Sequence, residues 1–196
     1  VLKGQGRITE INVASTIFIE QGKKTSLQQL FEQTKWKNAV LKPAISGAAR
    51  HTYKINIKNH MKYEEIFKKL ISKETMLFQE YLKNITKQGE ISLIMIGGEY
   101  THAVKKLAKK GDFRIQDDHG GTVEKHIATE SEISFAKQCL DKCPFNPIYA
   151  RVDIVYDNNN LASLSELELI EPELWFRNCK KSVEKLSTYI SKKLIF

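Results

Sequence analysis

The pattern of apolar and polar positions predicts short strands separated by a few amphipathic helices. Runs of β-branched and aromatic residues that end at turn residues are typical of strands, whereas apolar residues three and four apart are typical of helices. In the first half of the chain this predicts strands at 13–19, 38–43, 52–57 and 76–82 and helices at 27–33 and 63–73. Thr25 or Ser26 is expected to cap the first of these helices.

The second half of the chain favours hairpins. Strands are predicted at 90–96 and 100–105, on either side of a Gly-Gly turn, and at 149–156 and 163–170, on either side of an Asp-Asn-rich turn. Segment 107–126 is expected to be a loop. Helices are predicted at 131–143, capped by Ser131, and at 177–191, with Val183, Leu186 and Ile190 facing inward. This mixture of helices and antiparallel strands favours an α+β fold over a doubly wound parallel sheet.

Composition places the chain among globular proteins. Of its 196 residues, 41% are hydrophobic and 28% are charged, and no run of about 18 apolar residues predicts a membrane span. The three cysteines, Cys139, Cys143 and Cys179, are too few and odd in number for a disulfide framework. Cys139 and Cys143 could form half of a zinc site, but no second ligand pair has matching spacing. Buried thiols in a reducing cytoplasm are the favoured interpretation.

The net charge of +8 is concentrated in the first half of the chain. Residues 1–113 hold 20 Lys and Arg against 10 Asp and Glu, whereas residues 114–196 hold 11 against 13. A basic half favours a polyanionic partner, either a nucleic acid or the phosphates of a nucleotide. The scattered lysine pairs lack the interleaved aromatic residues that a single-strand-binding groove would show, so a nucleic acid is not expected.

The predicted strand pair at 149–156 and 163–170 carries an acidic face. Residues two apart on a strand point to the same side, so Arg151 lies beside Asp153, and Glu166 beside Glu168. If the two strands pair, three carboxylates and one guanidinium converge. Clustered carboxylates repel one another unless a cation neutralises them, and a set of oxygen ligands suits Mg²⁺ or Mn²⁺. The alternative is a solvated polar face on a half-buried sheet.

Several segments, taken in order, resemble the ATP-grasp superfamily, in particular the ATP-binding domains of prokaryotic glutathione synthetases and D-alanine–D-alanine ligases. These segments are the strand lysine with its small-residue phosphate loop, a hinge strand, the start of a second lobe, an Arg and Gly-Gly loop, and an acidic strand pair. They lie at 40–53, 77–82, 89–92, 111–122, and 150–153 with 166–172. The resemblance covers nearly the whole chain.

The resemblance implies an ATP-grasp domain over 1–196, with two α+β lobes that have antiparallel-rich sheets and clasp ATP. The small lobe is expected at about 24–82 and the large lobe at about 83–196. Family members also carry an N-terminal domain that helps to bind the second substrate. Almost nothing precedes residue 13 here, so we expect that domain to be absent from this chain.

The resemblance further implies a ligase that joins a carboxylic acid to an amine through an acyl phosphate, while ATP is cleaved to ADP and phosphate. The expected partners are therefore a small-molecule carboxylate and an amine, such as an amino acid or a peptide. We also expect a cytoplasmic protein that forms a homodimer and binds neither membrane nor nucleic acid.

Residue roles follow from the same resemblance. Asp153, Glu166 and Glu168 match the metal ligands, for Mg²⁺ or Mn²⁺, and Glu168 stands where the family often has Asn. Arg151 matches the residue that stabilises the oxyanion of the tetrahedral intermediate, and Arg114 is a second catalytic candidate. The residues implied to contact ATP are Lys42, Ser46, Gly47, Gln79, Glu80, Tyr81, Leu82, Glu90 and Lys106.

Within this set, the implied contacts differ in kind. Lys42 is expected to bind the α or β phosphate as a point charge. Backbone groups of Glu80 to Leu82 are expected to contact the edge of adenine, and Glu90 the ribose hydroxyls. Lys106 and Arg114 are expected to reach the terminal phosphate or the substrate carboxylate.

Two other classes of function stay open at this stage. A nucleic-acid-binding module would use the basic first half and would bind in a salt-sensitive way without ATP, but it leaves the acidic strand pair unexplained. A non-catalytic nucleotide-binding regulator would keep the ATP contacts and lack the acid and amine sites.

Overall fold

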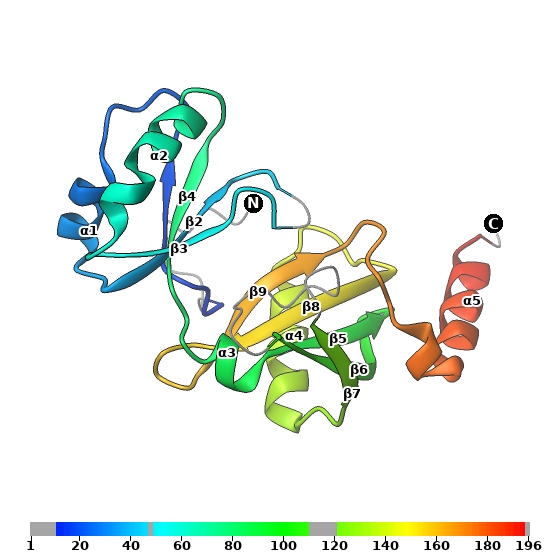
Figure 1. Ribbon diagram of the computed structural model, residues 1–196. Coiled ribbons are helices and arrows are strands. Elements are labelled where there is room, and N and C mark those ends of the chain that lie inside the picture. The colour runs from blue at the N-terminus through cyan, green and yellow to red at the C-terminus, as the bar shows by residue number, and fades with distance from the viewer. Residues whose placement is uncertain (1–10, 47–48, 110–120, 195–196) are drawn as a thin grey trace. The chain divides into compact units, whose positions relative to one another are not determined.

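The computed structural model describes residues 11–46, 49–109 and 121–194. The chain divides into two compact units, which Figure 1 shows. We call Ala14–Lys83 the small unit, and Asn84–Phe196 with Val1–Val13 the large unit. Each unit contains one antiparallel sheet. Of the helices in the described ranges, none has the length and apolarity needed to cross a membrane.

The small unit is a four-stranded sheet with two α-helices. Its strand order is β1-β4-β2-β3, with every neighbouring pair antiparallel. A capping box starts α1, because the Ser26 side chain accepts from the Gln29 N–H and the Gln29 side chain accepts from the Ser26 N–H. The elements are β1 (Thr16–Ile19), α1 (Leu27–Thr34), β2 (Asn38–Pro43), β3 (Tyr53–Asn56), a 3₁₀ turn (His60–Tyr63), α2 (Glu64–Ile71) and β4 (Met76–Glu80).

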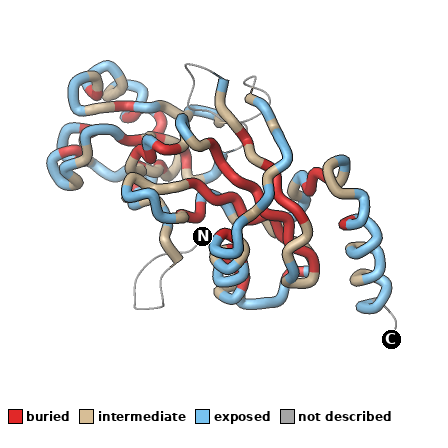
Figure 2. The backbone as a smooth tube through the Cα atoms, turned by 90° about the horizontal axis from the view of Figure 1, so that it is seen from below, coloured by how far each residue is buried: buried red, intermediate tan, exposed pale blue. Residues whose placement is uncertain are grey.

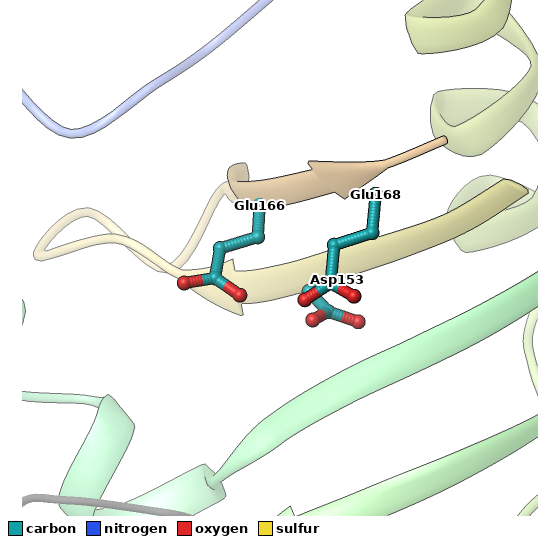
Figure 3. Close-up of side chains that lie close together, drawn as sticks. All are labelled: Asp153, Glu166 and Glu168. Atoms are coloured by element: carbon teal, nitrogen blue, oxygen red, sulfur yellow. The ribbon is translucent and has the colours of Figure 1, made fainter. Parts of the chain in front are cut away.

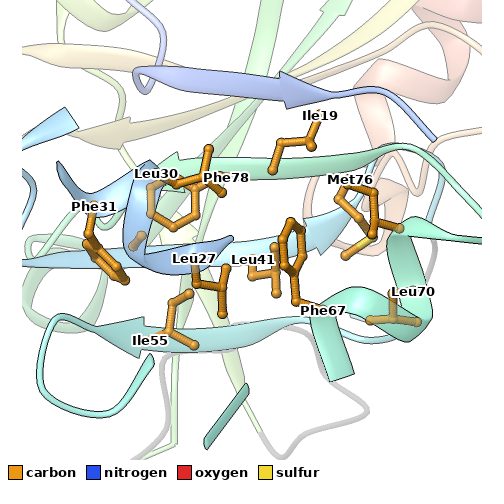
Figure 4. Close-up of a cluster of buried hydrophobic side chains, with 12 residues drawn as sticks. Ile19, Leu27, Leu30, Phe31, Leu41, Ile55, Phe67, Leu70, Met76 and Phe78 are labelled. Carbon is orange, nitrogen blue, oxygen red and sulfur yellow. The ribbon is translucent and has the colours of Figure 1, made fainter. Parts of the chain in front are cut away.

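One face of this sheet packs against α1 and α2. The buried cluster in Figure 4 combines residues of both helices with alternate residues of the strands. On β2, Ala39 and Leu41 are fully buried in this cluster, whereas Val40 and Lys42 are half-buried on the opposite face. The alternation of β2 therefore presents Lys42 on the face that the helices leave uncovered.

The large unit is a five-stranded antiparallel sheet with the order β7-β6-β5-β8-β9. Its central strand β5 is buried along its whole length, because separate apolar clusters pack on its two faces. Figure 2 shows the buried residues along the strands and the mostly exposed surface of α5. The elements are α3 (Ile85–Gln88), β5 (Glu90–Ile96), β6 (Glu99–Leu107), β7 (Thr122–His126), α4 (Glu130–Asp141), β8 (Tyr149–Tyr156), β9 (Ala162–Glu168), a 3₁₀ turn η3 (Phe176–Asn178) and α5 (Lys180–Leu194).

The structure confirms both predicted hairpins and corrects two expectations about their surroundings. Segment 107–126 is not all loop, because its end forms β7, an edge strand paired with β6. β7 carries exposed charged residues and therefore lacks the apolar alternation that predicts a strand. Such residues also protect a sheet edge from further pairing. The cap of α4 is Thr129 rather than Ser131, because Glu132 at the third helical position completes a capping box with Thr129.

The inward face of α5 also differs from the prediction. Val183 is 45% exposed, whereas Ser182 is buried. The contact face is formed by Ser182, Leu186 and Tyr189, and the latter two pack against the apolar cluster of β5 and β6. The Gly97-Gly98 turn explains this rotation, because the ring of Tyr189 lies directly against Gly97.

This contact predicts that Gly97→Ala destabilises the fold more than Gly98→Ala. Both glycines have positive φ, 60° and 80°, so alanine at either position costs roughly 1 kcal/mol of backbone strain. An added Cβ at Gly97 would also overlap the Tyr189 ring, whereas nothing lies within 4 Å of one at Gly98. We expect an additional cost of about 1–3 kcal/mol at Gly97, measured by urea unfolding.

The double variant Gly97→Ala/Tyr189→Ala provides the control, because the additional cost should disappear once the ring is gone. Equal destabilisation by Gly97→Ala and Gly98→Ala would show that Tyr189 does not anchor α5 at this turn.

Candidate functional site

The β8–β9 pair brings the predicted acidic residues together. The register sets Arg151 opposite Glu168 and Asp153 opposite Glu166, so all four share one face of the sheet. Figure 3 shows the three carboxylates pointing to the same side of the two strands. One oxygen from each lies within 4.8 Å of the others. The expected strand pairing and convergence of carboxylates are therefore confirmed.

Accessibility increases outward across this cluster, which we call the acidic cluster (Asp153, Glu166 and Glu168). The Asp153 side chain is fully buried, that of Glu168 is 34% exposed and that of Glu166 is 54% exposed. A ligand arriving from solvent would therefore meet Glu166 first and Asp153 last. Within the described ranges, no candidate metal cluster includes Cys139 or Cys143, which are free thiols.

Arg151 holds the deep end of the acidic cluster. Its Nε donates to Asp153 Oδ1 at 3.0 Å, its Nη2 donates to Asp153 Oδ2 at 2.8 Å, and Nη2 also pairs with Glu168. Glu166 Oε2 lies 3.8 Å from the same Nη2. One buried guanidinium therefore contacts all three carboxylates, a geometry that the planar fork of arginine supports.

Lys106 is a second buried cation at this site, contributed by β6. Its Nζ pairs with Glu90, the residue opposite it on β5, and lies 3.2 Å from Asp153 Oδ2. Glu90, Lys106 and Asp153 are all buried in the sheet. Burying a charge without partners is costly, so the two ion pairs are what permit these groups to lie inside the unit.

The site carries an excess of negative charge. Among the residues that the structure describes, four carboxylates, from Glu90 and the acidic cluster, face two cations, Lys106 and Arg151. Burial and the Asp153 charge raise the pKa of Glu90 to about 7, although Lys106 opposes the shift. Burial also raises the pKa of Glu168, with Asp153 and Glu166 adding to the shift and Arg151 opposing it.

The two cations stay charged in this setting. Burial lowers the pKa of Lys106, but Glu90 and Asp153 outweigh burial, so the pKa is raised overall. Burial likewise opposes the charge of Arg151, and the hydrogen bond and charge of Asp153 raise its pKa overall. A formal charge of two negative units therefore remains when all groups ionise, which one divalent cation bound through oxygen would neutralise.

The small unit carries the other predicted residues. Lys42 is half-buried opposite Leu77 of β4, on the sheet face away from the helices. Ser46 donates its hydroxyl to the Arg50 carbonyl at 3.0 Å, and Arg50 forms a bidentate ion pair with Glu74. Gly47 and Arg114 lie outside the described residues.

The predicted hinge strand is partly engaged in hydrogen bonds within the small unit. The Gln79 side chain donates to Thr16 Oγ1 at 2.9 Å, and Tyr81 and Leu82 are buried. The N–H groups of Glu80 and Tyr81 donate to the carbonyls of Ser15 and Asn38. These two N–H groups are therefore bonded within the small unit, and the expectation that backbone groups of Glu80 to Leu82 contact adenine stays a prediction.

Sequence analysis missed one residue that contacts the site. Trp175, between β9 and η3, has its ring 5.1 Å from the Arg151 guanidinium carbon and 5.5 Å from Lys106 Nζ. It lies in a segment without strand or helix periodicity, so nothing in the pattern of the chain connects it to β6 or β8.

The chain thus combines two antiparallel sheets, one of which ends in a strand pair with clustered carboxylates. The chain belongs to the family of prokaryotic glutathione synthetase ATP-grasp domains, whose sequence pattern matches residues 13–158. The recognition, the fold class and the antiparallel sheets expected from sequence are thereby confirmed. No curated protein matches the chain in sequence.

Solved structures of ATP-grasp enzymes share the fold. D-cycloserine synthetase DcsG has a TM-score of 0.79 at 18% identity, and the alignment covers 94% of this chain and 66% of DcsG. D-alanine–D-alanine ligase from Bacillus anthracis has a TM-score of 0.66 at 15% identity, covering 93% and 60%. The ligase PsnB, solved with a minimal precursor, Mg and ADP, has a TM-score of 0.63 at 14% identity, covering 92% and 54%. The chain thus spans between about half and two thirds of the length of these proteins.

The buried Glu90 predicts a stability that depends on pH in the absence of metal. Its pKa is 4.5 in the ordinary state and about 7 in the fold, so the folded state binds more protons between these values. The free energy of unfolding contributed by Glu90 should therefore decrease as pH rises from about 4.5 to about 7. Glu90→Gln should remove this contribution, measured by urea unfolding in EDTA at several pH values.

Glu99→Gln is the matched control, because Glu99 is an exposed carboxylate on the same sheet. If wild type and Glu90→Gln show parallel stability over this pH range, Glu90 does not take up the proton.

The acidic cluster predicts stabilisation by Mg²⁺. A ligand that binds only the folded state stabilises it by about 2.7 kcal/mol at 100 times its Kd. Glu166→Gln should preserve the metal-free fold, because Glu166 is the most exposed of the three, and should reduce the Mg²⁺-induced rise in Tm. An unchanged Mg²⁺ response in this variant would remove Glu166 from the ligand set.

Proposed function

We propose that this protein is an ATP- and Mg²⁺-dependent ligase that joins a carboxylate to an amine through an acyl phosphate. The observation that supports this most directly is the acidic cluster, held from its buried side by Arg151 and Lys106. A carboxylate is a poor electrophile, and transfer of the γ-phosphoryl group of ATP makes it reactive. Phosphoryl transfer requires positioning and charge neutralisation more than covalent participation by the protein.

The residues fit the proposed metal. Asp153, Glu166 and Glu168 would hold Mg²⁺, or Mn²⁺, through carboxylate oxygens, the ligands that these ions prefer. Bound there, the ion would supply charge neutralisation to the β and γ phosphates. Arg151 and Lys106 would direct their N–H groups toward the oxygens of the phosphoryl group and of the tetrahedral intermediate. Lys42 and Arg114 are proposed to add positive charge at the phosphates.

The proposed substrates are an amino acid or a peptide as the acid and a second small amine. This rests on the family and on the fold relatives, which are a D-cycloserine synthetase, a ligase of D-alanine with D-alanine, and a ligase solved with a minimal precursor. A cytoplasmic location and a homodimer stay predictions.

Hydroxylamine trapping tests the proposed reaction. The protein is incubated with MgATP, hydroxylamine and a panel of amino acids and short peptides, and ADP and hydroxamate are measured together. An acyl phosphate reacts with hydroxylamine to give one hydroxamate for each ADP. ATP binding without ADP formation across the panel would favour the non-catalytic nucleotide-binding regulator, and absence of MgATP binding would favour a general polyanion binder.

The proposed role of Lys42 predicts that removing its charge weakens nucleotide binding. Lys42→Ala removes a cation from the uncovered face of the small-unit sheet, so the Kd for MgATP should rise at least about tenfold, or about 1.4 kcal/mol. Lys37→Ala, an exposed lysine just before β2, controls for loss of net charge. Calorimetric titration that gives equal affinities for wild type and Lys42→Ala would exclude Lys42 from the nucleotide site.

A further inference from the structure

Trp175 occupies a position that packing alone does not explain. It is 5% exposed and lies in the apolar cluster of Ile94, Ile96 and Val104, on one face of the large-unit sheet. Its backbone is in the left-handed region, with φ 45° and ψ 42°. Residues other than glycine, asparagine and aspartate rarely adopt this conformation. Its indole N–H is buried without a hydrogen-bond partner among the described residues. A phenylalanine or leucine would fill this space without burying a polar group.

The backbone at Trp175 is held by contacts that do not involve the acidic cluster. The backbone N–H of Trp175 donates to Glu173 Oε1 at 2.6 Å, and the backbone carbonyl of Trp175 accepts from the Asn178 N–H at 2.8 Å. The preceding carbonyl, of Leu174, is bonded to His102 Nε2 on β6 at 3.0 Å. The backbone on both sides of Trp175 is therefore anchored by groups outside the acidic cluster, and its ring packs in the apolar cluster.

What the ring does contact is both cations of the site. Arg151 and Lys106 lie 5.1 Å and 5.5 Å from its centroid, within the distance at which an aromatic face attracts a cation. We propose that Trp175 is the positioning residue for Arg151 and Lys106. A strained, buried residue with an unbonded N–H is consistent with a role at a functional site.

The reason for an aromatic ring lies in the competition for carboxylates. Both cations pair with Asp153, which is also a proposed metal ligand, whereas Glu168 also pairs with Arg151 and Glu90 with Lys106. A divalent cation bound there would draw on the same oxygens and repel both side chains. The face of an indole attracts the two cations without binding the metal and without titrating. This consequence for turnover rests on the proposed function, whereas the positioning itself rests on the geometry.

The NMR signal of the Arg151 Nε–H tests the positioning in the full chain without metal or nucleotide. Arg151→Lys identifies the signal by its loss. We expect it in wild type to be shifted by the indole ring current and to exchange slowly, because Nε–H is bonded to Asp153. Trp175→Leu should abolish the ring-current shift and speed exchange, and Trp175→Phe should restore part of both.

Phe176→Leu is the matched control, because Phe176 packs in the same apolar cluster and is the next residue in the chain. It should leave the Arg151 signal in place. An Arg151 signal in Trp175→Leu equal to that of wild type overturns the proposal. If Trp175→Leu does not fold, Trp175→Phe is measured instead. A change in its Arg151 Nε–H signal no larger than the change in Phe176→Leu overturns the proposal as well.

Two further measurements separate positioning from a general structural role. The Mg²⁺-induced rise in Tm should persist in Trp175→Phe, because the ligand oxygens are intact, and its loss would contradict a role confined to the cations. In the hydroxylamine assay, Trp175→Leu should lower kcat about tenfold, with partial rescue by Trp175→Phe and no effect of Phe176→Leu. An unchanged kcat in Trp175→Leu overturns the consequence for turnover. Absence of ADP formation in wild type counts against the proposed function alone, since the Arg151 signal still decides the positioning.

Discussion

The large unit depends on the burial of one carboxylate, that of Asp153, in the middle of a sheet. A buried carboxylate is tolerated only when cations and hydrogen bonds compensate its lost hydration. Here Arg151 comes from the same strand, two residues away, and Lys106 comes from β6, two strands across the sheet. The antiparallel register of β6, β5, β8 and β9 is therefore also the arrangement that keeps this charge paired. A register shift of one residue in any of these strands would point a charged side chain toward an apolar cluster on the other face of the sheet.

The parts of this arrangement that arise from local periodicity could be predicted from the sequence. Two-residue spacing placed Arg151 with Asp153 and Glu166 with Glu168, and the turn between the strands fixed their pairing. The partnership of Lys106 with Asp153 joins residues 47 apart in the chain through an intervening strand. No local pattern encodes which lysine of β6 faces that strand. Pattern analysis therefore brought the acidic residues together, whereas the ion pairs of Lys106 with Glu90 and Asp153 appear only in the structure.

Two of the errors in the fold arise from tertiary contact overriding local preference, whereas the wrong cap of α4 is local, because Thr129 and Glu132 form its capping box. The strand β7 is polar and gains its structure from pairing with β6. The helix α5 turns Ser182 inward rather than Val183, because the ring of Tyr189 fits against a glycine that has no side chain. Trp175 depends on three separate anchors, one of them a histidine on β6. The partner of each of these segments on another element, β6 for β7, Gly97 for α5 and His102 for the chain beside Trp175, is not encoded by local periodicity.

The charge balance of the site also bears on the choice between the three classes of function. A module that binds nucleic acid needs cations directed at phosphates, yet the two buried cations of the large unit are directed at carboxylates. Burial raises the pKa of Glu90 and the charge of Asp153 adds to the shift, so ionising both carboxylates is unfavourable in this setting. A protein that used this sheet only as a scaffold could relieve the repulsion with an amide in place of the exposed Glu166. The carboxylates of the acidic cluster repel one another, and a divalent cation bound there would offset this repulsion. The cluster is therefore understandable as a metal-dependent site.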